Sequence, residues 1–509
     1  MNLKESKNKK ITNRILFVVG FLLFAYVATR AYLLSFTWDE SYSYLRFARN
    51  GITNLNHFDD MSANNHLLNT WLMIICSKIF GVSEFSLRLP NLLSYLLFLI
   101  YSAKLVKHLL SNILIIAAFL ILNLNPYLLD FFSLARGYGL SIGLMMASLY
   151  YAYKFIQRKE NYLSAFISVL FASLAILANF TLIIYFLSIT GLFVLINYFR
   201  VMDHKSLSTQ KKFILMIREN LLICSPLAIL IFVGPIITNL NNAGALFYGG
   251  ESGFWNDTVF SLITQFTYGN PFMHFLRNGI QIGVALVLIA SVVMIFIHLK
   301  TKKETWKSFY LLFIAIVILL CFLANFCQGT IMGMMYLTNR TGLFYYPLFI
   351  ILMVFLFDLL ILKKKKVFTG ILLGFTLVFI TNFILSINFH YVIQWKKEAD
   401  VKDMMAQITE LNTDLIGEKK PKNISLSIPK DQWLYGPDIN FYQQKDKLDW
   451  IKLIPNENYK DSVPDYFFIE KIEMYKLKGQ YGSDYPFFNY KIIKEYPTSE
   501  MLLVEVKKP

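Results

Sequence analysis

Two adjacent carboxylates, Asp39 and Glu40, follow the first long apolar stretch of the chain, in the run from Thr37 to Tyr42. Charged side chains at the edge of a membrane are costly unless they are paired or used. A carboxylate in that place can take the proton of an acceptor hydroxyl while a sugar carbon becomes oxocarbenium-like. Acids also favour helix amino termini, so the pair could simply cap the helix that follows. The pair alone leaves both interpretations open.

Other polar residues recur at the ends of apolar stretches and would complete such a site. They lie in the motifs Asn64-Asn65-His66, Arg88-Leu89-Pro90, Ala135-Arg136-Gly137-Tyr138 and Asn339-Arg340-Thr341. A guanidinium group at the end of a span can bind a lipid phosphate through two hydrogen bonds. A single arginine there is usually a snorkelling anchor. Three arginines together with an acidic pair favour a site that holds a sugar phosphate.

The order of these motifs resembles that of bacterial membrane glycosyltransferases related to the protein O-mannosyltransferases and the lipid A aminoarabinose transferases, a group with the GT-C fold. In that family the first outer loop opens with an Asp-Glu pair and continues through a histidine motif and an Arg-Leu-Pro motif. An Ala-Arg-Gly-Tyr-like motif comes next. The resemblance covers residues 30 to 200 well and the later spans only by architecture.

The resemblance implies a role for each matching residue. Asp39 would be the catalytic base, Glu40 and His66 would line the sugar and phosphate pocket, and Arg88 would hold the acidic pair in place. Relatives often have proline directly after the histidine, whereas this chain has Leu67. The fixed backbone bend that proline provides is therefore missing here.

The later motifs would bind the donor. Arg136 would face the outer surface near the lipid carrier, and Tyr138 belongs to the same substrate-binding motif. Arg340, with the tyrosines that follow it, matches a late Arg-Tyr-rich motif of the family loosely.

The composition of the chain is that of an integral membrane protein. Of 509 residues 56% are hydrophobic, and the mean hydropathy is +0.49, far too apolar for a soluble protein of this length. The net charge of +16 comes largely from lysine clusters between apolar stretches, where lysines set membrane orientation. It therefore does not indicate a nucleic-acid partner. The four cysteines lie in or beside apolar segments and form neither a disulfide framework nor a metal site.

Apolar stretches of about 20 residues predict about eleven membrane spans. They cover residues 15–36, 88–108, 112–132, 138–156, 161–178, 180–199, 219–238, 279–299, 308–327, 341–362 and 367–389. The stretch 66–80 is short and carries Asn69 and Lys78. If it does not cross, all the lysine clusters share one face, which must be cytoplasmic. We therefore expect an interfacial or re-entrant helix there.

That topology gives the chain three parts on the non-cytoplasmic side of a membrane, which we expect to be a bacterial plasma membrane. They are a first loop at 37–87, a second at 239–278, and everything after the transmembrane domain of residues 1–390. Tyr248, Trp255, Phe266 and Tyr268 in the second loop are expected as an interfacial aromatic belt.

Residues 391–509 differ in composition from the rest and predict a small α/β domain. Its strand-like runs are 424–428, 450–454, 466–469, 490–493 and 501–506, with an amphipathic stretch at 395–411 and a helical run near 435–444. The predicted fold is thus a polytopic helical membrane protein of GT-C type with a small outer α/β domain.

We expect no cofactor. His57, Asp59, Asp60 and His66 could bind a divalent metal with Asp39, but their spacing is not that of a tight metal site, and a solvated loop is the simpler interpretation.

The predicted activity is inverting transfer of a sugar from a polyprenyl-phosphate donor to a lipid, glycan or protein acceptor, in contact with the bilayer. A transporter or flippase of lipid-linked sugars is the main alternative, although such proteins tend to show inverted repeats, which are not visible here. A non-catalytic scaffold would leave the acids and arginines without a purpose.

Overall fold

The computed structural model describes most of the chain. The described residues are 3–51, 62–157, 161–203, 208–301, 306–362, 364–413, 423–428, 435–454, 463–481 and 489–507. They form two compact units, which are treated separately below. The helical unit contains Met1–Ala28, Phe58–Asn69 and Leu89–Ile387, and the second unit contains Thr29–His57, Thr70–Arg88 and Asn388–Pro509.

Three helices are divided between the units, namely α1 (Leu3–Leu33), α3 (Leu67–Phe80) and α4 (Glu84–Val106). The other helices of the helical unit are α5 (Asn112–Asn123), α6 (Pro126–Phe132), α7 (Gly137–Gln157), α8 (Tyr162–Ala178), α9 (Ile183–Met202), α10 (Thr209–Cys224), α11 (Ile229–Asn242), α12 (Phe260–Phe266), α13 (Pro271–Thr301), α14 (Trp306–Thr330), α15 (Asn339–Gly342), α16 (Tyr345–Ile361) and α17 (Lys365–Ser386). The short 3-10 helices η3 (Phe180–Leu182) and η4 (Ser225–Ala228) and the short π-helix η5 (Phe254–Val259) join some of them.

Every predicted span falls on one of these helices or on two in succession. Within the described residues, seven helices are long and apolar enough to cross a membrane, or eight if the bent pair α5–α6 counts as one span. The helices α3, α8 and α16 are apolar but shorter. The helix α7 is long enough to cross but is not among the helices that are also apolar enough. The multi-pass membrane fold is thus confirmed, while the number of about eleven spans stays a prediction.

The helix α7 departs from the apolar pattern because it is buried within protein. Nearly all of its residues are inaccessible. The Ser148 hydroxyl lies 3.1 Å from that of Ser168 on α8 and 2.9 Å from the hydroxyl of Tyr185 on α9. Hydrogen bonds of this kind join helices in lipid, where the hydrophobic effect does not drive helices together. A helix so enclosed needs less apolar surface than one that faces lipid.

The bend between α5 and α6 has a local cause. The two helices meet at 63°. Pro126 opens α6 and has no N–H to continue the hydrogen bonds of α5, while the Asn125 side chain accepts a hydrogen bond from Leu128 N and starts a new helix. This break sets the direction of α6 immediately before the Ala-Arg-Gly-Tyr motif.

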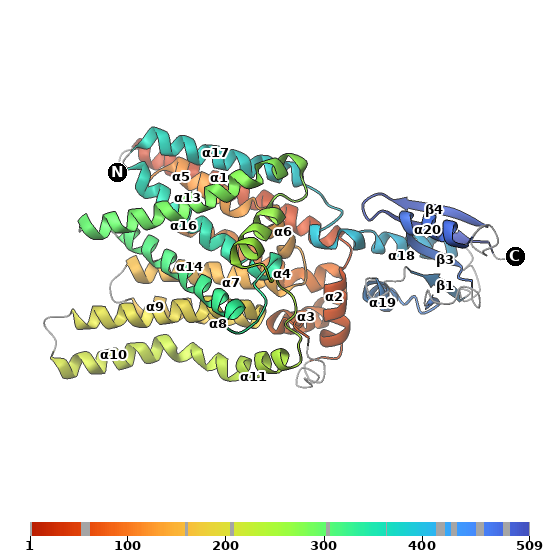
Figure 1. Ribbon diagram of the computed structural model, residues 1–509, viewed down its shortest axis with the longest axis horizontal. Coiled ribbons are helices and arrows are strands. Elements are labelled where there is room, and N and C mark those ends of the chain that lie inside the picture. Colours follow the sequence, from red (N-terminus) through yellow and green to blue (C-terminus); the bar gives the residue numbers. More distant parts are fainter. Residues whose placement is uncertain are drawn as a thin grey trace. The chain divides into compact units, whose positions relative to one another are not determined.

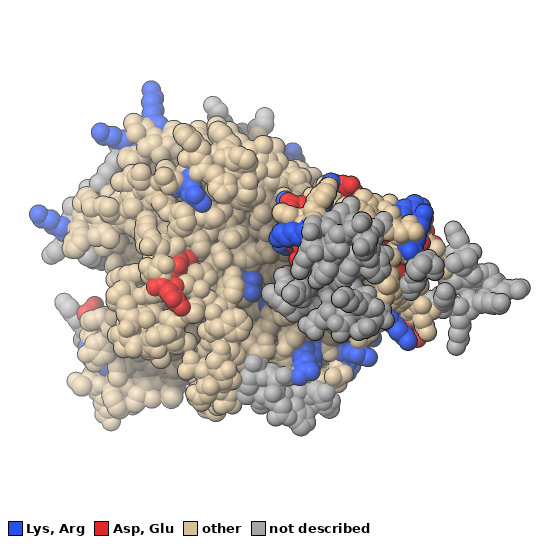
Figure 2. Space-filling view, turned by 45° about the vertical axis from the view of Figure 1, so that its right-hand side comes forward, with Lys and Arg blue, Asp and Glu red and all other residues tan. Residues whose placement is uncertain are grey.

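The basic cluster at the amino terminus and the one at the α9–α10 connection lie at the same end of the helical unit. The amino-terminal start of α1 and the ends of α9 and α10 that face each other lie at the same end of the helical unit, on the left in Figure 1. Figure 2 shows a broad, largely uncharged surface over the helical unit, as expected of a surface in contact with lipid. Both features agree with the predicted grouping of lysines on one face.

The second unit contains a mixed five-stranded sheet, with strand order β2-β1-β3-β5-β4. Its strands are β1 (Ile424–Ser427), β2 (Ile451–Ile454), β3 (Tyr466–Glu470), β4 (Tyr490–Tyr496) and β5 (Met501–Val506). The strand β1 pairs in parallel with β2 and β3, and β5 pairs antiparallel with β3 and β4. All five predicted strands are present.

The core of this sheet lies on its central strands. Phe467 and Ile469 of β3 pack with Leu502, Val504 and Val506 of β5. The edge strand β4 carries the exposed Lys491 and the partly exposed Lys494, and charged side chains of this kind discourage pairing with another chain.

Helices flank the sheet. The amphipathic stretch becomes the turn η6 (Ile393–Glu398) followed by α18 (Val401–Thr413), and the helical run is α19 (Gly436–Lys445). The helix α20 (Lys471–Tyr481), which lies beside β3, was not predicted (Figure 1). The same unit also holds α2 (Trp38–Ser43) and the turn η1 (Tyr44–Ala48), which carry the acidic pair and the residues after it.

Candidate active site

The acidic pair lies in the first turn of α2, and its neighbour Thr37 starts that helix. The Thr37 hydroxyl accepts a hydrogen bond from Glu40 N, and the Glu40 carboxylate accepts one from Thr37 N at 3.0 Å. This reciprocal arrangement is a capping box, which satisfies backbone N–H groups that no earlier turn can satisfy. The capping interpretation is therefore right for Glu40.

Arg88 at the start of α4 also binds Glu40. Its Nε donates to Glu40 Oε1 at 2.8 Å and its Nη2 to Glu40 Oε2 at 2.7 Å. Both side chains are completely buried. The result is a bidentate ion pair between residues 48 positions apart in the chain.

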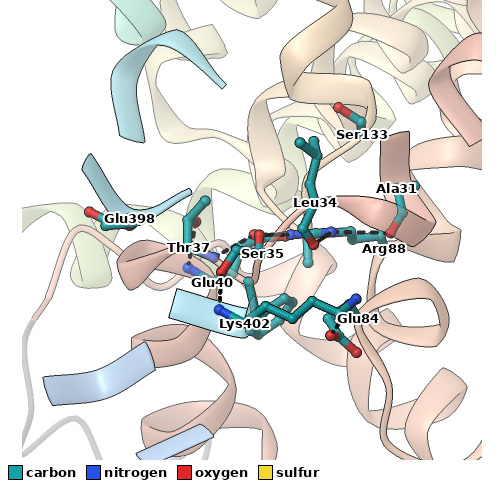
Figure 3. Close-up of polar contacts among 12 residues, drawn as sticks. Ala31, Leu34, Ser35, Thr37, Glu40, Glu84, Arg88, Ser133, Glu398 and Lys402 are labelled. Atoms are coloured by element: carbon teal, nitrogen blue, oxygen red, sulfur yellow. Dashed lines mark hydrogen bonds and ion pairs between the residues drawn. The ribbon is translucent and has the colours of Figure 1, made fainter. Parts of the chain in front are cut away.

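The rest of the Arg88 guanidinium binds the end of α1 and the residues after it. Its Nη1 donates to the carbonyl oxygens of Ala31 and Leu34, and its Nη2 to that of Ser35 (Figure 3). With the two bonds to Glu40, all five N–H donors of the side chain are used. Arg88 thus ties α1, the acidic motif and α4 together, and in this arrangement it has no donor left for a phosphate.

Asp39 has a different place from its neighbour. It is only 5% exposed, although its carboxylate is not one of the groups that occupy the five donors of Arg88. Tyr42 stacks on Trp38 with ring centroids 5.1 Å apart and makes that side of α2 rigid. Glu40 therefore has a structural role in this motif, through the capping box and its ion pair with Arg88.

The carboxyl-terminal part of the chain meets this motif directly. Glu398 of η6 accepts a hydrogen bond from Trp38 N at 2.7 Å, and the Tyr442 hydroxyl of α19 accepts one from Phe36 N at 2.8 Å. The ring of Phe441 stacks on Phe36 at 4.2 Å. We call Asp39, Glu40, Arg88, Glu398 and Asp438 the acid cluster.

Lysines of the same part bind the start of α4. Lys402 of α18 lies 3.0 Å from the carboxylate of Glu84, four residues before Arg88 (Figure 3). Lys445 of α19 lies at the same distance from that carboxylate. These contacts hold the α4 start, and with it Arg88, against the carboxyl-terminal helices. Sequence reasoning missed Glu398, Asp438 and these lysines, because no local pattern in the sequence distinguishes them.

A second group of polar side chains lies inside the helical unit. We call His66, Arg136, Tyr138, Tyr248 and Arg340 the arginine cluster. Arg136, which is 1% exposed, donates two hydrogen bonds to Asn64, one to the backbone oxygen and one to the side-chain oxygen. The Tyr138 ring lies 4.8 Å from the His66 ring and 5.9 Å from the Arg136 guanidinium carbon.

His66 is a neutral side chain with one nitrogen available. Burial lowers its pKa well below the ordinary histidine range, and the positive charges of Arg136 and Arg340 lower it further, while a hydrogen bond with the Ala178 backbone opposes this. Its Nε2 is buried and has no hydrogen-bond partner within the described residues. A buried polar atom of this kind is explained by a ligand or an ordered water molecule.

Arg340 belongs to this group although it lies about 200 positions after Arg136 in the chain. Its guanidinium carbon lies 4.2 Å from the centre of the Tyr248 ring, which is cation–π geometry. Tyr248 also accepts a hydrogen bond from the Asn339 side chain at 3.3 Å. Of the residues predicted as an aromatic belt, Tyr248 thus contacts an arginine of the site.

Tyr268, from the same loop, is buried rather than interfacial. Its hydroxyl donates to Asp130 Oδ1 on α6 at 2.9 Å. Asp130 was not recognised from the sequence, since it lies alone in an apolar stretch. A carboxylate inside a predicted span was the available signal.

Gly137 makes the arginine cluster compact. A Cβ atom at this position would lie 1.8 Å from the Ala178 carbonyl oxygen and 2.6 Å from His66 Cγ. Glycine lets α7 approach both groups closely.

Gly137→Ala is expected to lower the free energy of unfolding by about 1–3 kcal/mol, because the backbone of α8 or the His66 ring must move. Thermal unfolding in detergent measures the change. The matched control is Gly191→Ala in α9, where a Cβ meets nothing within 4 Å, and alanine there should be neutral or slightly stabilising. Equal melting temperatures for both variants would contradict the packing described.

No group of three or more His, Cys, Asp or Glu side chains that could hold a metal ion occurs among the residues that the structure describes. Three of the four predicted loop ligands, His57, Asp59 and Asp60, lie outside the described residues. His66, the fourth, packs against the Tyr138 ring of the arginine cluster.

Comparison with known proteins agrees with the motifs. Residues 65–230 match the family described as dolichyl-phosphate-mannose-protein mannosyltransferase. That region includes His66, Arg88, Arg136 and Tyr138. No curated protein sequence matches the chain.

The fold is similar to that of ArnT from Cupriavidus metallidurans in the apo state, with a TM-score of 0.52 and 10% identity over 96% of each chain. The same protein bound to undecaprenyl phosphate gives 0.49 and 11%, over 96% of this chain and 97% of that one. The Archaeoglobus fulgidus oligosaccharyltransferase in complex with Zn and sulfate gives 0.44 and 13%, over 90% and 68%.

These findings bear on the class of the protein. The chain has the GT-C fold with a small carboxyl-terminal sheet, as the resemblance implied. The family match over residues 65–230 and this fold together support a multi-pass membrane glycosyltransferase.

Proposed function

We propose that the protein transfers a sugar from a polyprenyl-phosphate carrier to an acceptor on the non-cytoplasmic side of the membrane, with inversion at the anomeric carbon. The family matched by residues 65–230 is described by a sugar linked to a dolichyl phosphate, which is a polyprenyl phosphate. The observation that carries the proposal is the buried acidic motif, in which Arg88 binds Glu40 and the adjacent Asp39 is only 5% exposed.

The proposed reaction is a single displacement. Asp39 accepts the proton of the acceptor group as that group attacks the anomeric carbon. The bond between this carbon and the phosphate oxygen breaks, and the polyprenyl phosphate leaves with the electron pair. One base and a good leaving group are enough, so no covalent sugar intermediate is needed.

The arginine cluster would bind the donor phosphate. Arg136 and Arg340 supply positive charge, and guanidinium groups match phosphate oxygens geometrically. Neutral His66 would offer its buried Nε2 to a sugar or phosphate oxygen. Positive charge from arginines can stabilise the departing phosphate, so the mechanism does not require a metal ion.

A donor-cleavage assay separates this function from that of a flippase. Purified protein in detergent is given polyprenyl-phosphate sugars labelled in the sugar, together with a cell-envelope extract as acceptor. We expect label to move into an acceptor-linked product, with release of one polyprenyl phosphate for each sugar.

A flippase would behave differently in the same assay. It would carry intact donor across the bilayer of a proteoliposome and release no polyprenyl phosphate in either setting. That result would refute the proposed function. Once cleavage is seen, glycolipid profiling of a deletion strain identifies whether the acceptor is a lipid, a glycan or a protein.

A further inference from the structure

Asp438 lies in the first turn of α19, the helix that packs against α2. Contacts on the same helix define this interface: Phe441 stacks on Phe36 and meets the Tyr44 ring edge-on with centroids 5.7 Å apart. Tyr442 accepts its hydrogen bond from Phe36 N. The helix α19 of the carboxyl-terminal domain therefore covers one side of the acidic motif.

Asp438 is an acidic residue that is fully buried in this interface between α19 and α2. Its relative exposure is 0%, and neither carboxyl oxygen has a hydrogen bond of ordinary geometry among the described residues, although the Ser41 hydroxyl lies close to the carboxyl group. Burying an ionised carboxylate without a partner costs several kcal/mol, which a neutral carboxylic acid largely avoids. The geometry alone therefore favours the protonated form.

The surrounding charges act in the same direction. Burial raises the pKa of Asp438 well above the ordinary aspartate range, the Glu398 carboxylate raises it further, and Glu40 and Asp39 add to this. The Ser41 hydroxyl works against them. Three carboxyl groups of the acid cluster thus act on a fourth, which comes from a distant part of the chain.

We propose that Asp438 is a positioning residue of the acid cluster, a carboxylic acid that stays neutral so that α19 can pack against α2 and keep Asp39 in place. This inference rests on the proposed function for the role of Asp39. Asp438 itself forms and breaks no bond in the reaction.

The other charged groups near this interface are occupied elsewhere. Arg88 is paired with Glu40, while Lys402 and Lys445 are paired with Glu84. On α18, Asp403 pairs with Lys494 at 2.5 Å. These cations compensate other carboxylates, so ionised Asp438 would add a negative charge to a cluster that already contains Asp39 and Glu398.

Ionisation of Asp438 at alkaline pH should therefore weaken the packing of α19 against α2. Because its pKa is raised in the folded state, its contribution to stability is complete below the ordinary aspartate pKa and is lost as the pH rises through the folded value. Asp438→Asn is neutral at every pH and nearly the same shape. We expect it to unfold at a higher temperature than the unchanged protein at pH 8.5, with the difference shrinking toward pH 4.5.

The activity test uses the same variant. We expect the kcat of the unchanged protein to fall at alkaline pH. Asp438→Asn should keep more than half of the kcat at pH 7 and show no such fall. The control is Asp449→Asn, an exposed residue in the turn after α19, which should alter neither profile. An alkaline fall that Asp438→Asn leaves intact would overturn the positioning role.

The two readouts separate this inference from the proposed function. If the unchanged protein transfers no sugar, the proposed function fails, while the melting temperatures still test whether Asp438 is neutral. If transfer occurs but Asp438→Asn melts like the unchanged protein at every pH, this inference alone is wrong.

Discussion

Asp39→Asn is expected to lower the rate of sugar transfer by about 10²–10⁴-fold, the usual contribution of a general base. An amide has nearly the same shape as the carboxylate but cannot take the acceptor proton. The capping box and the Arg88 pair belong to Glu40 and Thr37, so the substitution leaves them intact. The melting temperature and membrane insertion should therefore stay close to those of the unchanged protein. Donor cleavage by the purified variant measures the rate.

Asp403→Asn is the matched control for this experiment. Asp403 is an exposed aspartate of the same unit whose ion pair within the described residues is with Lys494 at the surface. Exposed pairs contribute little to stability, so this variant should retain full activity. Full activity of Asp39→Asn as well would remove Asp39 from the role of base.

Arg88→Met is expected to destabilise the protein by about 3–5 kcal/mol, because it leaves the buried Glu40 carboxylate without its partner. The same change removes the donors to three backbone carbonyl groups at the end of α1. A loss of this size is a large part of the stability of a typical domain. We expect little monodisperse protein after extraction in detergent, measured by size-exclusion chromatography and thermal unfolding.

A double variant shows whether the ion pair is the cause. Arg88→Met with Glu40→Gln removes both charges, and it should recover part of the stability that the single variant loses. Arg218→Met is the control, since Arg218 is 74% exposed beside Glu219 and should change stability by less than about 1 kcal/mol. Equal stability of the single and double variants would show that Glu40 does not depend on Arg88 for its charge balance.

Much of the architecture was predictable because its signals are local. Long apolar stretches predicted the helices, and short alternating or apolar runs predicted all five strands. The exact number of about eleven spans stays a prediction, since seven described helices, or eight with the bent pair α5–α6, are long and apolar enough to cross, while α8 and α16 are apolar but shorter. The helix α20 was missed because its sequence has no clear apolar face.

The site was predictable to the extent that it lies in motifs. Glu40 and Arg88 were expected to act together, and the structure gives the hydrogen bonds that join them. The expectation that all three arginines can meet a phosphate does not fit Arg88, whose donors are all engaged within the protein. Asp130 and Glu398 belong to no recognisable motif, and so they were not singled out.

The sequence by itself determined that this is a membrane protein of GT-C type with a small carboxyl-terminal α/β domain, because hydropathy, periodicity and the order of motifs are local features of the chain. Only the tertiary structure decided which acid is structural and which residues surround Asp39. Trp38 and Glu398 are 360 positions apart, and Asp438 is more distant still. Such neighbours arise from the packing of whole helices, which buries some charges against partners and others without them, and no local pattern encodes that outcome.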